Sequence, residues 1–230
     1  MEVFELAYYL DGPQLRLLLS LIDGRAVMGV PPVEEPESWQ AVSLSLLEAG
    51  RLRCQGERLV MDQELSGLLL GIKDASRVYM VFGKRPDPFA LTLYGGRPPV
   101  LLEHLPERRV RLSQAEADAL PRLTEDCLFP SSPMPEALLA SLPDDPALQA
   151  CLAAWEGQAV LLEDPPARWM DLPQVRGVID RWTPEGHSRW IWAEDALAGA
   201  VLRQDRDGIH AALDTPSRRR ELAAELEWEA

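Results

Sequence analysis

The sequence contains few cysteines and histidines, and their positions exclude several kinds of site. The three cysteines are too scattered for a disulfide framework or a paired-cysteine metal site. The three histidines lack the spacing of a metal-binding or metalloprotease motif. We therefore expect no metal site, no cofactor and reduced thiols. The residues are Cys54, Cys127, Cys151, His104, His187 and His210.

Positive charge is also scarce. The chain carries 23 basic and 37 acidic residues, a net charge of −14, and only two of the basic residues are lysines. A field of that sign repels phosphate backbones and anionic lipid surfaces, so we expect no nucleic-acid partner and no membrane insertion. No apolar run approaches the ~20 residues of a membrane helix. The first five residues lack the basic region of a signal peptide, which favours a cytoplasmic protein.

Catalytic motifs are missing as well. The chain has no G-x-S-x-G elbow and no glycine-rich phosphate loop, and His187 beside Ser188 lacks the further groups that activate a serine. Asp205–Gly208 resembles the middle of a calcium loop, but Arg203 stands where the first acidic ligand belongs, so we predict a hairpin turn. We predict no catalytic residues and no enzyme; an enzyme of unrecognised class is an alternative.

The clearest pattern in the chain is a β-meander over residues 77–112. Four short runs of β-branched, aromatic or alternating apolar residues are separated by glycine and proline turns. Short links favour antiparallel pairing. Ser113 and Glu116 have the spacing of a capping box and predict a helix immediately afterwards. The four runs are Val78–Phe82, Phe89–Tyr94, Val100–His104 and Arg109–Leu112.

Residues 12–74 predict two helices, a small hairpin and a third helix. Asp11 caps the first helix, Gly56 turns the hairpin, and Asp62 caps the third helix. This is the outline of a winged-helix module, so a DNA-binding regulator is an alternative function. The second helix, Trp39–Ala49, offers only Gln40 as a reader of a base edge.

The second half of the chain repeats this element order. A proline-rich segment at 129–135 predicts a linker, and short helices follow at 136–142 and 145–155. Further strands are predicted, the last pair joined at Asp207-Gly208, before a helix with Leu222 and Leu226 facing inward. The predicted strands are 159–163, 175–182, 188–192, 197–204 and 209–213.

The predicted fold class is therefore α+β, with two quasi-repeated halves, each an antiparallel meander with helices on one face. The predicted domains are 1–128, including the winged-helix-like segment, and 129–230. A single compact domain is the alternative.

Six of the seven tryptophans follow residue 154. Trp190 and Trp192 share a strand face, where Trp182 of the neighbouring strand could pair with them. Core packing is favoured over a partner-binding face for this group. Trp169 follows two prolines and is predicted to be an exposed anchor instead.

The order of elements resembles that of the EspG-type chaperones of type VII secretion systems. The resemblance is carried by the helix–glycine–hairpin–aspartate–helix unit Ser45–Leu69, by Ser76–Gly83, and by Gly177–Leu226. It implies a cytosolic, non-catalytic protein that binds a secreted helical substrate and keeps it soluble until export. The loop at 83–88 and the segment around Trp169 are the candidate partner contacts, while the oligomeric state is open. These candidate residues are Lys84, Arg85, Asp87, Trp169 and Met170.

Overall fold

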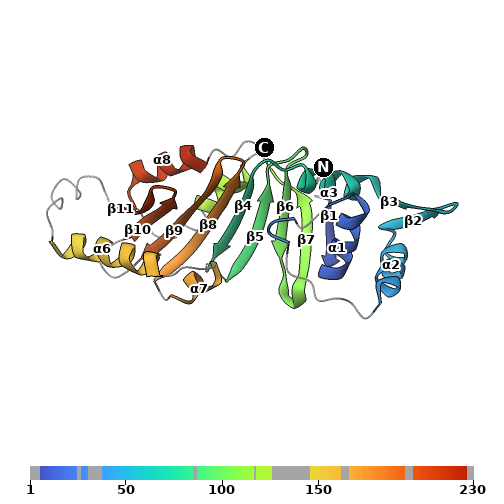
Figure 1. The fold of residues 1–230 in the computed structure, drawn as a ribbon, viewed down its shortest axis with the longest axis horizontal. Helices are drawn as coiled ribbons and strands as arrows, with labels where there is room; N and C mark the ends of the chain where they lie inside the picture. Colours follow the sequence, from blue (N-terminus) through green and yellow to red (C-terminus); the bar gives the residue numbers. More distant parts are fainter. Residues whose placement is uncertain are drawn as a thin grey trace, which may run out of the picture. The chain divides into compact units, whose positions relative to one another are not determined.

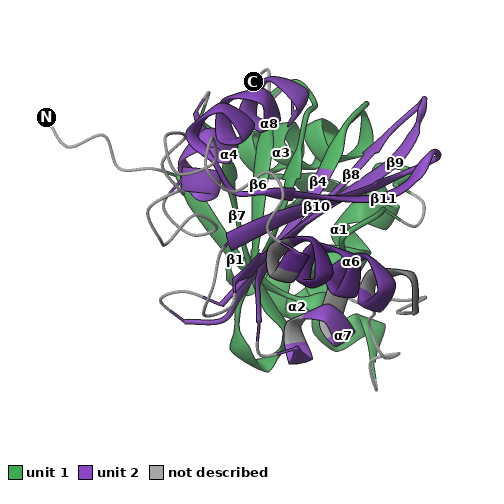
Figure 2. Ribbon diagram, turned by 90° about the vertical axis from the view of Figure 1, so that its left-hand side faces the viewer, with its two compact units in different colours: residues 1–78, 91–117, 230 green, residues 79–90, 118–229 purple. Residues whose placement is uncertain are grey.

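A computed structural model describes residues 6–24, 27–30, 38–84, 87–116, 118–125, 146–161, 166–172, 174–194 and 199–226. The predicted linker at 129–135 and helix at 136–142 lie outside these ranges. The chain divides into two compact units (Figure 2). Unit 1 comprises residues 1–78, 91–117 and 230, and unit 2 comprises residues 79–90 and 118–229.

Nine strands form an antiparallel sheet in the hydrogen-bonding order β1-β7-β6-β5-β4-β8-β9-β10-β11 (Figure 1). The predicted α+β fold class is confirmed. All four runs of the predicted central meander are strands, and each hairpin of the second half forms near its predicted turn. The strands are β1 (Ala7–Asp11), β4 (Val78–Gly83), β5 (Phe89–Tyr94), β6 (Val100–His104), β7 (Arg109–Gln114), β8 (Val175–Thr183), β9 (Gly186–Glu194), β10 (Gly199–Asp205) and β11 (Gly208–Leu213).

Unit 1 is built on helices α1 (Gly12–Leu21), α2 (Trp39–Glu48) and α3 (Gln63–Lys73). The predicted Asp11 cap of α1 is confirmed, and it forms a capping box: Asp11 Oδ1 accepts from the Gln14 N–H at 2.7 Å, and Gln14 Oε1 accepts from the Asp11 N–H at 3.0 Å. Leucines on the apolar stripes of α1 and α3 pack against alternate residues of β1, β6 and β7 in one core. This core includes Leu15, Leu18, Leu65, Leu69, Tyr8, Leu10, Leu102 and Leu112.

A separate two-stranded sheet, β2 (Leu52–Gln55) and β3 (Arg58–Met61), joins α2 to α3. Gly56 turns this hairpin with a φ of +65°, a conformation that glycine adopts without strain. The side chain of Asp62 then caps α3 by accepting from the Leu65 N–H at 3.1 Å. The predicted order of helix, helix, hairpin and helix is confirmed.

Unit 2 places helices on both faces of β8–β11. Helices α6 (Pro146–Leu161) and α7 (Pro166–Asp171) pack on one face, where Trp155 and Trp169 join Ile191 and other apolar residues in a core. Helix α8 (Pro216–Leu226) packs on the other face, since the Trp190 Nε1–H donates to the Glu225 carboxylate at 3.3 Å. Successive residues of a strand point to opposite faces, as Trp190 and Ile191 do here. Leu222 and Leu226 are buried, as predicted.

The predicted helix cap at Ser113 is wrong. Ser113 lies inside β7, where it is opposite Ala7 of β1 and Leu101 of β6. Pairing with strands on both sides extends β7 past the point where the residue pattern changes. The next helix, α4 (Ala119–Leu123), begins later, and Asp118 precedes it without a side-chain capping bond.

The strand predicted at 159–163 is also wrong where the structure describes it. Residues 159–161 are the last turn of α6, which runs without interruption from Pro146. A short run of alanine, valine and leucine is compatible with either structure, and here the helix propagates into it.

The predicted cross-strand partners of Trp182 are incorrect. The two-residue turn at Pro184–Glu185 sets a register in which Trp182 lies opposite His187, and their rings stack with centroids 4.8 Å apart. Trp190 instead lies opposite Ile179. The prediction that Trp190 and Trp192 are core residues is confirmed, because their exposed fractions are 0% and 2%.

Helix α3 meets the β5–β6 turn without an intervening side chain. A Cβ atom at Gly71 would lie 2.3 Å from the Pro98 carbonyl oxygen, and one at Gly96 would lie 1.9 Å from the Gly71 carbonyl oxygen. Real Cβ atoms do not come this close to a backbone oxygen, so the contact requires glycine at both positions.

Candidate functional site

The structure brings the predicted contact residue Lys84 next to α7. Lys84 directly follows β4, and its N–H donates to the Arg176 carbonyl at 3.1 Å. Its ammonium group donates to the Leu172 carbonyl at 2.6 Å, one residue beyond α7. Burial, with a smaller contribution from Arg176, lowers the pKa of Lys84. Lys84 therefore fastens the end of β4 to the segment that follows α7.

The remaining predicted residues of the loop are only partly described. Asp87 is exposed at the start of the return to β5. Arg85 lies outside the described residues. The partner-binding role of this loop stays a prediction.

The prediction that Trp169 is an exposed anchor is wrong. Its exposed fraction is 0%, and it packs with Trp155, Val175 and Val178. The two prolines that suggested a loop precede or begin α7, where a proline fits the first turn, and the helix turns Trp169 into the core. Met170 follows in α7, but its side chain is not described. Trp169 therefore supports α7 from within the core.

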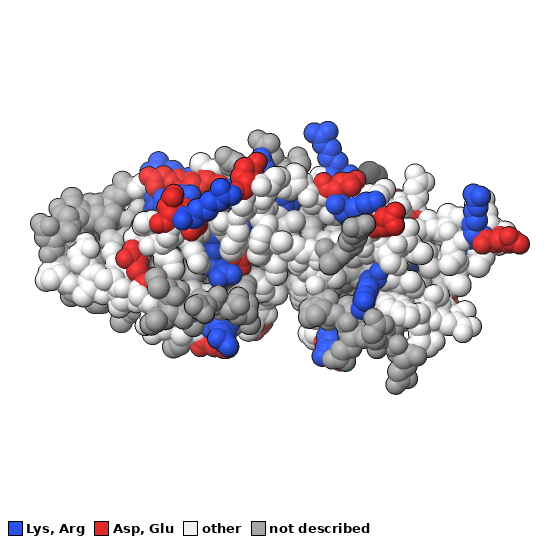
Figure 3. All heavy atoms as spheres, viewed as in Figure 1, with Lys and Arg blue, Asp and Glu red and all other residues white. Residues whose placement is uncertain are grey.

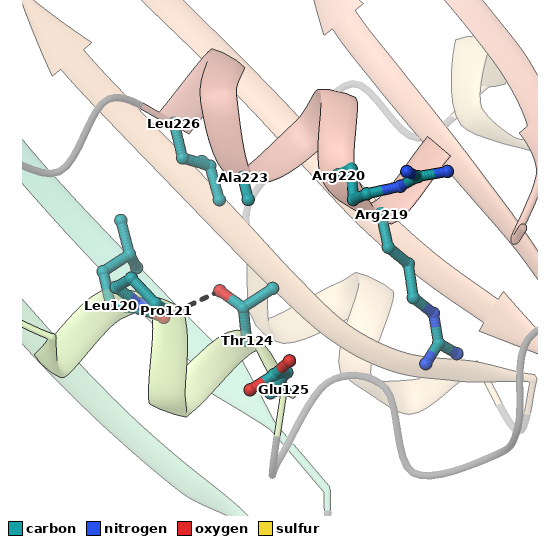
Figure 4. Close-up of a pocket in the computed structure, with 8 residues that line it drawn as sticks. All are labelled: Leu120, Pro121, Thr124, Glu125, Arg219, Arg220, Ala223 and Leu226. Carbon is teal, nitrogen blue, oxygen red and sulfur yellow. Dashed lines mark hydrogen bonds between the residues drawn. The ribbon is translucent and has the colours of Figure 1, made fainter. Parts of the chain in front are cut away.

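A pocket of about 280 Å³ opens between α8 and the segment formed by α4 and the two residues after it. Leu120 and Leu226 are buried, while Pro121 and Ala223 contribute exposed apolar surface nearby. Figure 4 shows the charged groups Glu125, Arg219 and Arg220 displaced from this apolar part. The eight lining residues are Leu120, Pro121, Thr124, Glu125, Arg219, Arg220, Ala223 and Leu226.

Three polar side chains of the pocket, Thr124, Arg219 and Arg220, are held by hydrogen bonds. Arg219 binds Asp214 through two hydrogen bonds, Nε to Oδ1 at 2.7 Å and Nη2 to Oδ2 at 2.5 Å. The Thr124 hydroxyl donates to the Leu120 carbonyl at 2.8 Å, so it is a helix back-bond and not a nucleophile (Figure 4). The exposed Arg220 directs its Nε–H to the Pro216 carbonyl at 3.3 Å.

The pocket thus combines an apolar wall with fixed charges. No histidine or cysteine is among its described lining residues, and no hydroxyl there contacts a base. This arrangement suits an apolar side chain with a polar neighbour better than it suits bond-breaking chemistry.

The α8 wall of the pocket is attached to the sheet through Glu225. Besides Trp190, the Glu225 carboxylate binds Arg203 at 3.4 Å and Arg218 at 3.3 Å. Arg181 donates to the Glu225 carbonyl and also lies over the Trp190 ring, 5.0 Å from its centroid. Acidic and basic atoms accordingly interleave over α8 (Figure 3). Ion pairs and two leucines hold this helix in place.

The histidines do not form a metal site in the described ranges, where no cluster of three candidate ligands occurs. His104 lies 3.4 Å from the Thr92 hydroxyl, and burial lowers its pKa. His187 contacts the buried Asp180 carboxylate at 2.7 Å, and Arg189 binds the same carboxylate. Asp180 therefore compensates an arginine inside the sheet. His210 is an exposed strand residue.

One feature of this pocket could be predicted from the sequence. The inward positions of Leu222 and Leu226 followed from their spacing. That α4 and α8, about 100 residues apart in the sequence, would share a pocket was not evident, because it depends on how the intervening strands fold.

No helix in the described part of the chain has both the length and the hydropathy needed to cross a membrane.

Comparison with known proteins shows a likeness in structure but not in sequence. No protein-family model and no curated protein sequence matches the chain. The fold is similar to that of EspG5, a type VII secretion system chaperone of Mycobacterium tuberculosis, solved in complex with the PE25–PPE41 dimer. The likeness has a TM-score of 0.56 at 11% sequence identity and covers 98% of this chain and 97% of the other. At this identity it establishes a shared fold.

Proposed function

We propose that the protein is a non-catalytic, cytoplasmic chaperone or adaptor of secretion that binds a helical substrate protein and keeps it soluble until export. The main support is the similarity in fold to a secretion chaperone that was solved in complex with a protein dimer. This similarity covers nearly the whole of both chains. The apolar pocket between α4 and α8 supports the same function, since it offers a concave surface without catalytic groups.

In this proposal, a large apolar side chain at the end of a substrate helix enters the pocket. Leu120 and Leu226 provide the floor, and burying such a side chain contributes about 1.5–3 kcal/mol. Arg220 and Glu125 at the rim select the polar residues that flank it. Because Arg219 is already bound to Asp214, the wall is preorganised and binding orders few side chains.

The β4–β5 loop is the second proposed contact. Lys84 fixes one end of the loop, which leaves the exposed Asp87 available to a substrate. Arg85 and Met170 remain proposed contacts on the basis of the sequence alone. Trp169 is excluded as a direct contact by its burial.

The test is an affinity purification of the tagged full-length chain from its own cells, with bound proteins identified by mass spectrometry. Ala223→Arg places a long side chain in the pocket, and Ala224→Arg is the matched control because Ala224 is exposed on the same helix but does not line the pocket. We expect helical secretion substrates to bind the wild type and Ala224→Arg and to be lost at least about tenfold from Ala223→Arg. Recovery of nucleic acid, or equal binding by both variants, contradicts the proposal.

A further inference from the structure

The β2–β3 hairpin of unit 1 stands apart from the nine-stranded sheet. It forms a two-stranded sheet of its own (Figure 1). Residues 53–60 are all exposed. Leu59 and Val60 on β3 have exposed fractions of 49% and 42%. Two strands alone are marginally stable in water, and an apolar edge strand is a template for further pairing.

The hairpin's register shows which backbone groups face outward from β3. Asp62 donates its N–H to the Arg51 carbonyl at 3.0 Å, which makes these two residues a hydrogen-bonded pair. Hydrogen-bonded and non-hydrogen-bonded pairs alternate along an antiparallel ladder. The pair Arg53–Val60 is therefore bonded within the hairpin, whereas Leu59 and Met61 direct their N–H and C=O groups away from β2.

This outer edge is complementary to itself about a two-fold axis at Val60. Such an axis places Leu59 opposite Met61 of a second copy, and Met61 opposite Leu59 of that copy. Both positions have outward-facing backbone groups, so the two pairs exchange four hydrogen bonds. The apolar side chains form a ladder on one face. On the other face, Val60 meets Val60 of the second copy, and Arg58 meets its Asp62.

We propose that β3 pairs antiparallel with β3 of a second copy of this chain, joining two hairpins into a four-stranded sheet and forming a two-fold symmetric dimer. The interface is isologous, with the same edge used by both copies. Opposite charges at Arg58 and Asp62 favour this register, in which every other pair is apolar.

The outer edge of β2 is a poorer candidate. The same alternation makes Leu52 and Cys54 the outward-facing residues of β2, so the equivalent symmetric register is centred on Arg53. That register sets Arg53 directly against Arg53 of the second copy, and like charges at directly opposite positions destabilise a sheet. Moving the two-fold axis of the β3 pair by one residue, from Val60 to Leu59, removes the Arg58–Asp62 pair and places Glu57 opposite Met61.

Cysteine crosslinking tests the register in the full chain. Val60→Cys and Leu59→Cys are compared in a Cys54→Ser background, because Cys54 is exposed and free. At the axis, the Cα atoms of position 60 are about 4.5 Å apart, within disulfide range. The two copies of residue 59 are diagonal neighbours at about 7–8 Å, beyond that range. The two positions are similarly exposed, so their reactivity as free thiols is matched.

On mild oxidation we expect a disulfide dimer of Val60→Cys at a rate at least about tenfold that of Leu59→Cys. Equal rates, or no dimer from either variant, overturn the proposal. Sedimentation equilibrium of Leu59→Pro is the second measurement. Proline removes an outward N–H and leaves the bonds to β2 intact. We expect its dimer dissociation constant to rise at least about tenfold; a wild type that stays monomeric at all concentrations overturns the proposal.

Discussion

Helices α3 and α8 are both 11 residues long and both cover a sheet face, but different forces hold them. Helix α3 buries Leu65, Leu68, Leu69 and Ile72 in the core of unit 1. Helix α8 buries only Leu222 and Leu226 and carries the Glu225 ion-pair cluster.

The comparison shows that equal length does not imply equal sensitivity to the solvent. Charge screening by salt does not weaken apolar burial, whereas it weakens partly exposed ion pairs. Because α8 forms one wall of the proposed substrate pocket, the geometry of that pocket depends on salt. We expect no such dependence for the packing of α3 in unit 1.

The largest expected effect is at Leu69 of α3. Its exposed fraction is 0%, so Leu69→Ala removes buried methyl groups and leaves a cavity. We expect the free energy of unfolding to fall by about 2–5 kcal/mol, equally at low and high salt. Urea denaturation measures this, with the exposed neighbour Leu70→Ala as a control that changes stability by less than about 0.5 kcal/mol. A salt-dependent loss at Leu69 would contradict the assignment of α3 to apolar packing.

Gly96→Ala tests the contact that seats α3 on the β5–β6 turn. The new methyl group would lie 1.9 Å from the Gly71 carbonyl oxygen, so backbone must move, at a cost of about 1–3 kcal/mol. Gly67→Ala, which lies on α3, is the control, because no atom lies within 4 Å of the Cβ position of Gly67. Alanine there should stabilise by about 0.5–1 kcal/mol. Thermal unfolding distinguishes the two variants. Equal shifts in their melting temperatures would mean that α3 can move relative to the β5–β6 turn.

Glu225→Gln weakens the cluster that holds α8. With the Glu225 side chain 26% exposed, we expect a loss of about 1 kcal/mol at low salt that shrinks in 1 M salt. Glu221→Gln is the control: Glu221 binds the same Arg218, but 62% of its side chain is exposed, and its loss should be smaller. Urea titration at two ionic strengths measures both. The absence of any salt dependence would show that α8 is held by its leucines alone.

The pH dependence of unit 1 has the smallest expected effect. Burial, followed by the 2.6 Å hydrogen bond to Asp62, raises the pKa of Tyr8 from its usual 10 to about 12. A raised pKa means that folding favours the protonated phenol, so this stabilisation is complete below pH 10 and is lost between pH 10 and 12.

Stability curves of wild type and Tyr8→Phe from pH 8 to 12 check this. The variant should lose less stability over the alkaline range. Burial also raises the pKa of Tyr94, so part of the wild-type slope should remain in the variant. An identical slope in both proteins would rule out the effect of Tyr8.

Local features of the sequence predicted most of the fold. The capping box at Asp11, the turn at Gly56 and the alternation in the meander act within a few residues, and each appears in the structure. Errors occurred where distant partners decide the outcome. β7 runs past Leu112 to Gln114 because β1 and β6 pair with it, and Trp169 is buried because α7 packs on β8.

The candidate site was less predictable than the fold. Leu226 was expected to face inward from a helix, but the pocket that it shares with Leu120 requires α4 and α8 to meet across about 100 residues of chain. The role of Glu225 could not be predicted, since the sequence does not show which of the two glutamates of α8 faces the sheet. Its partner Arg203 lies in β10, and no sequence motif links this strand to α8.

The contact between Gly71 and Gly96 constrains how the chain can vary. Each position excludes a side chain because backbone occupies the space, the Pro98 carbonyl at Gly71 and the Gly71 carbonyl at Gly96, so a smaller residue elsewhere cannot compensate for a change at either. The two positions should therefore stay glycine together in related chains while the surrounding leucines exchange for other apolar residues. Backbone contacts at these two glycines therefore set the distance between α3 and the β5–β6 turn, whatever side chains fill the rest of the core.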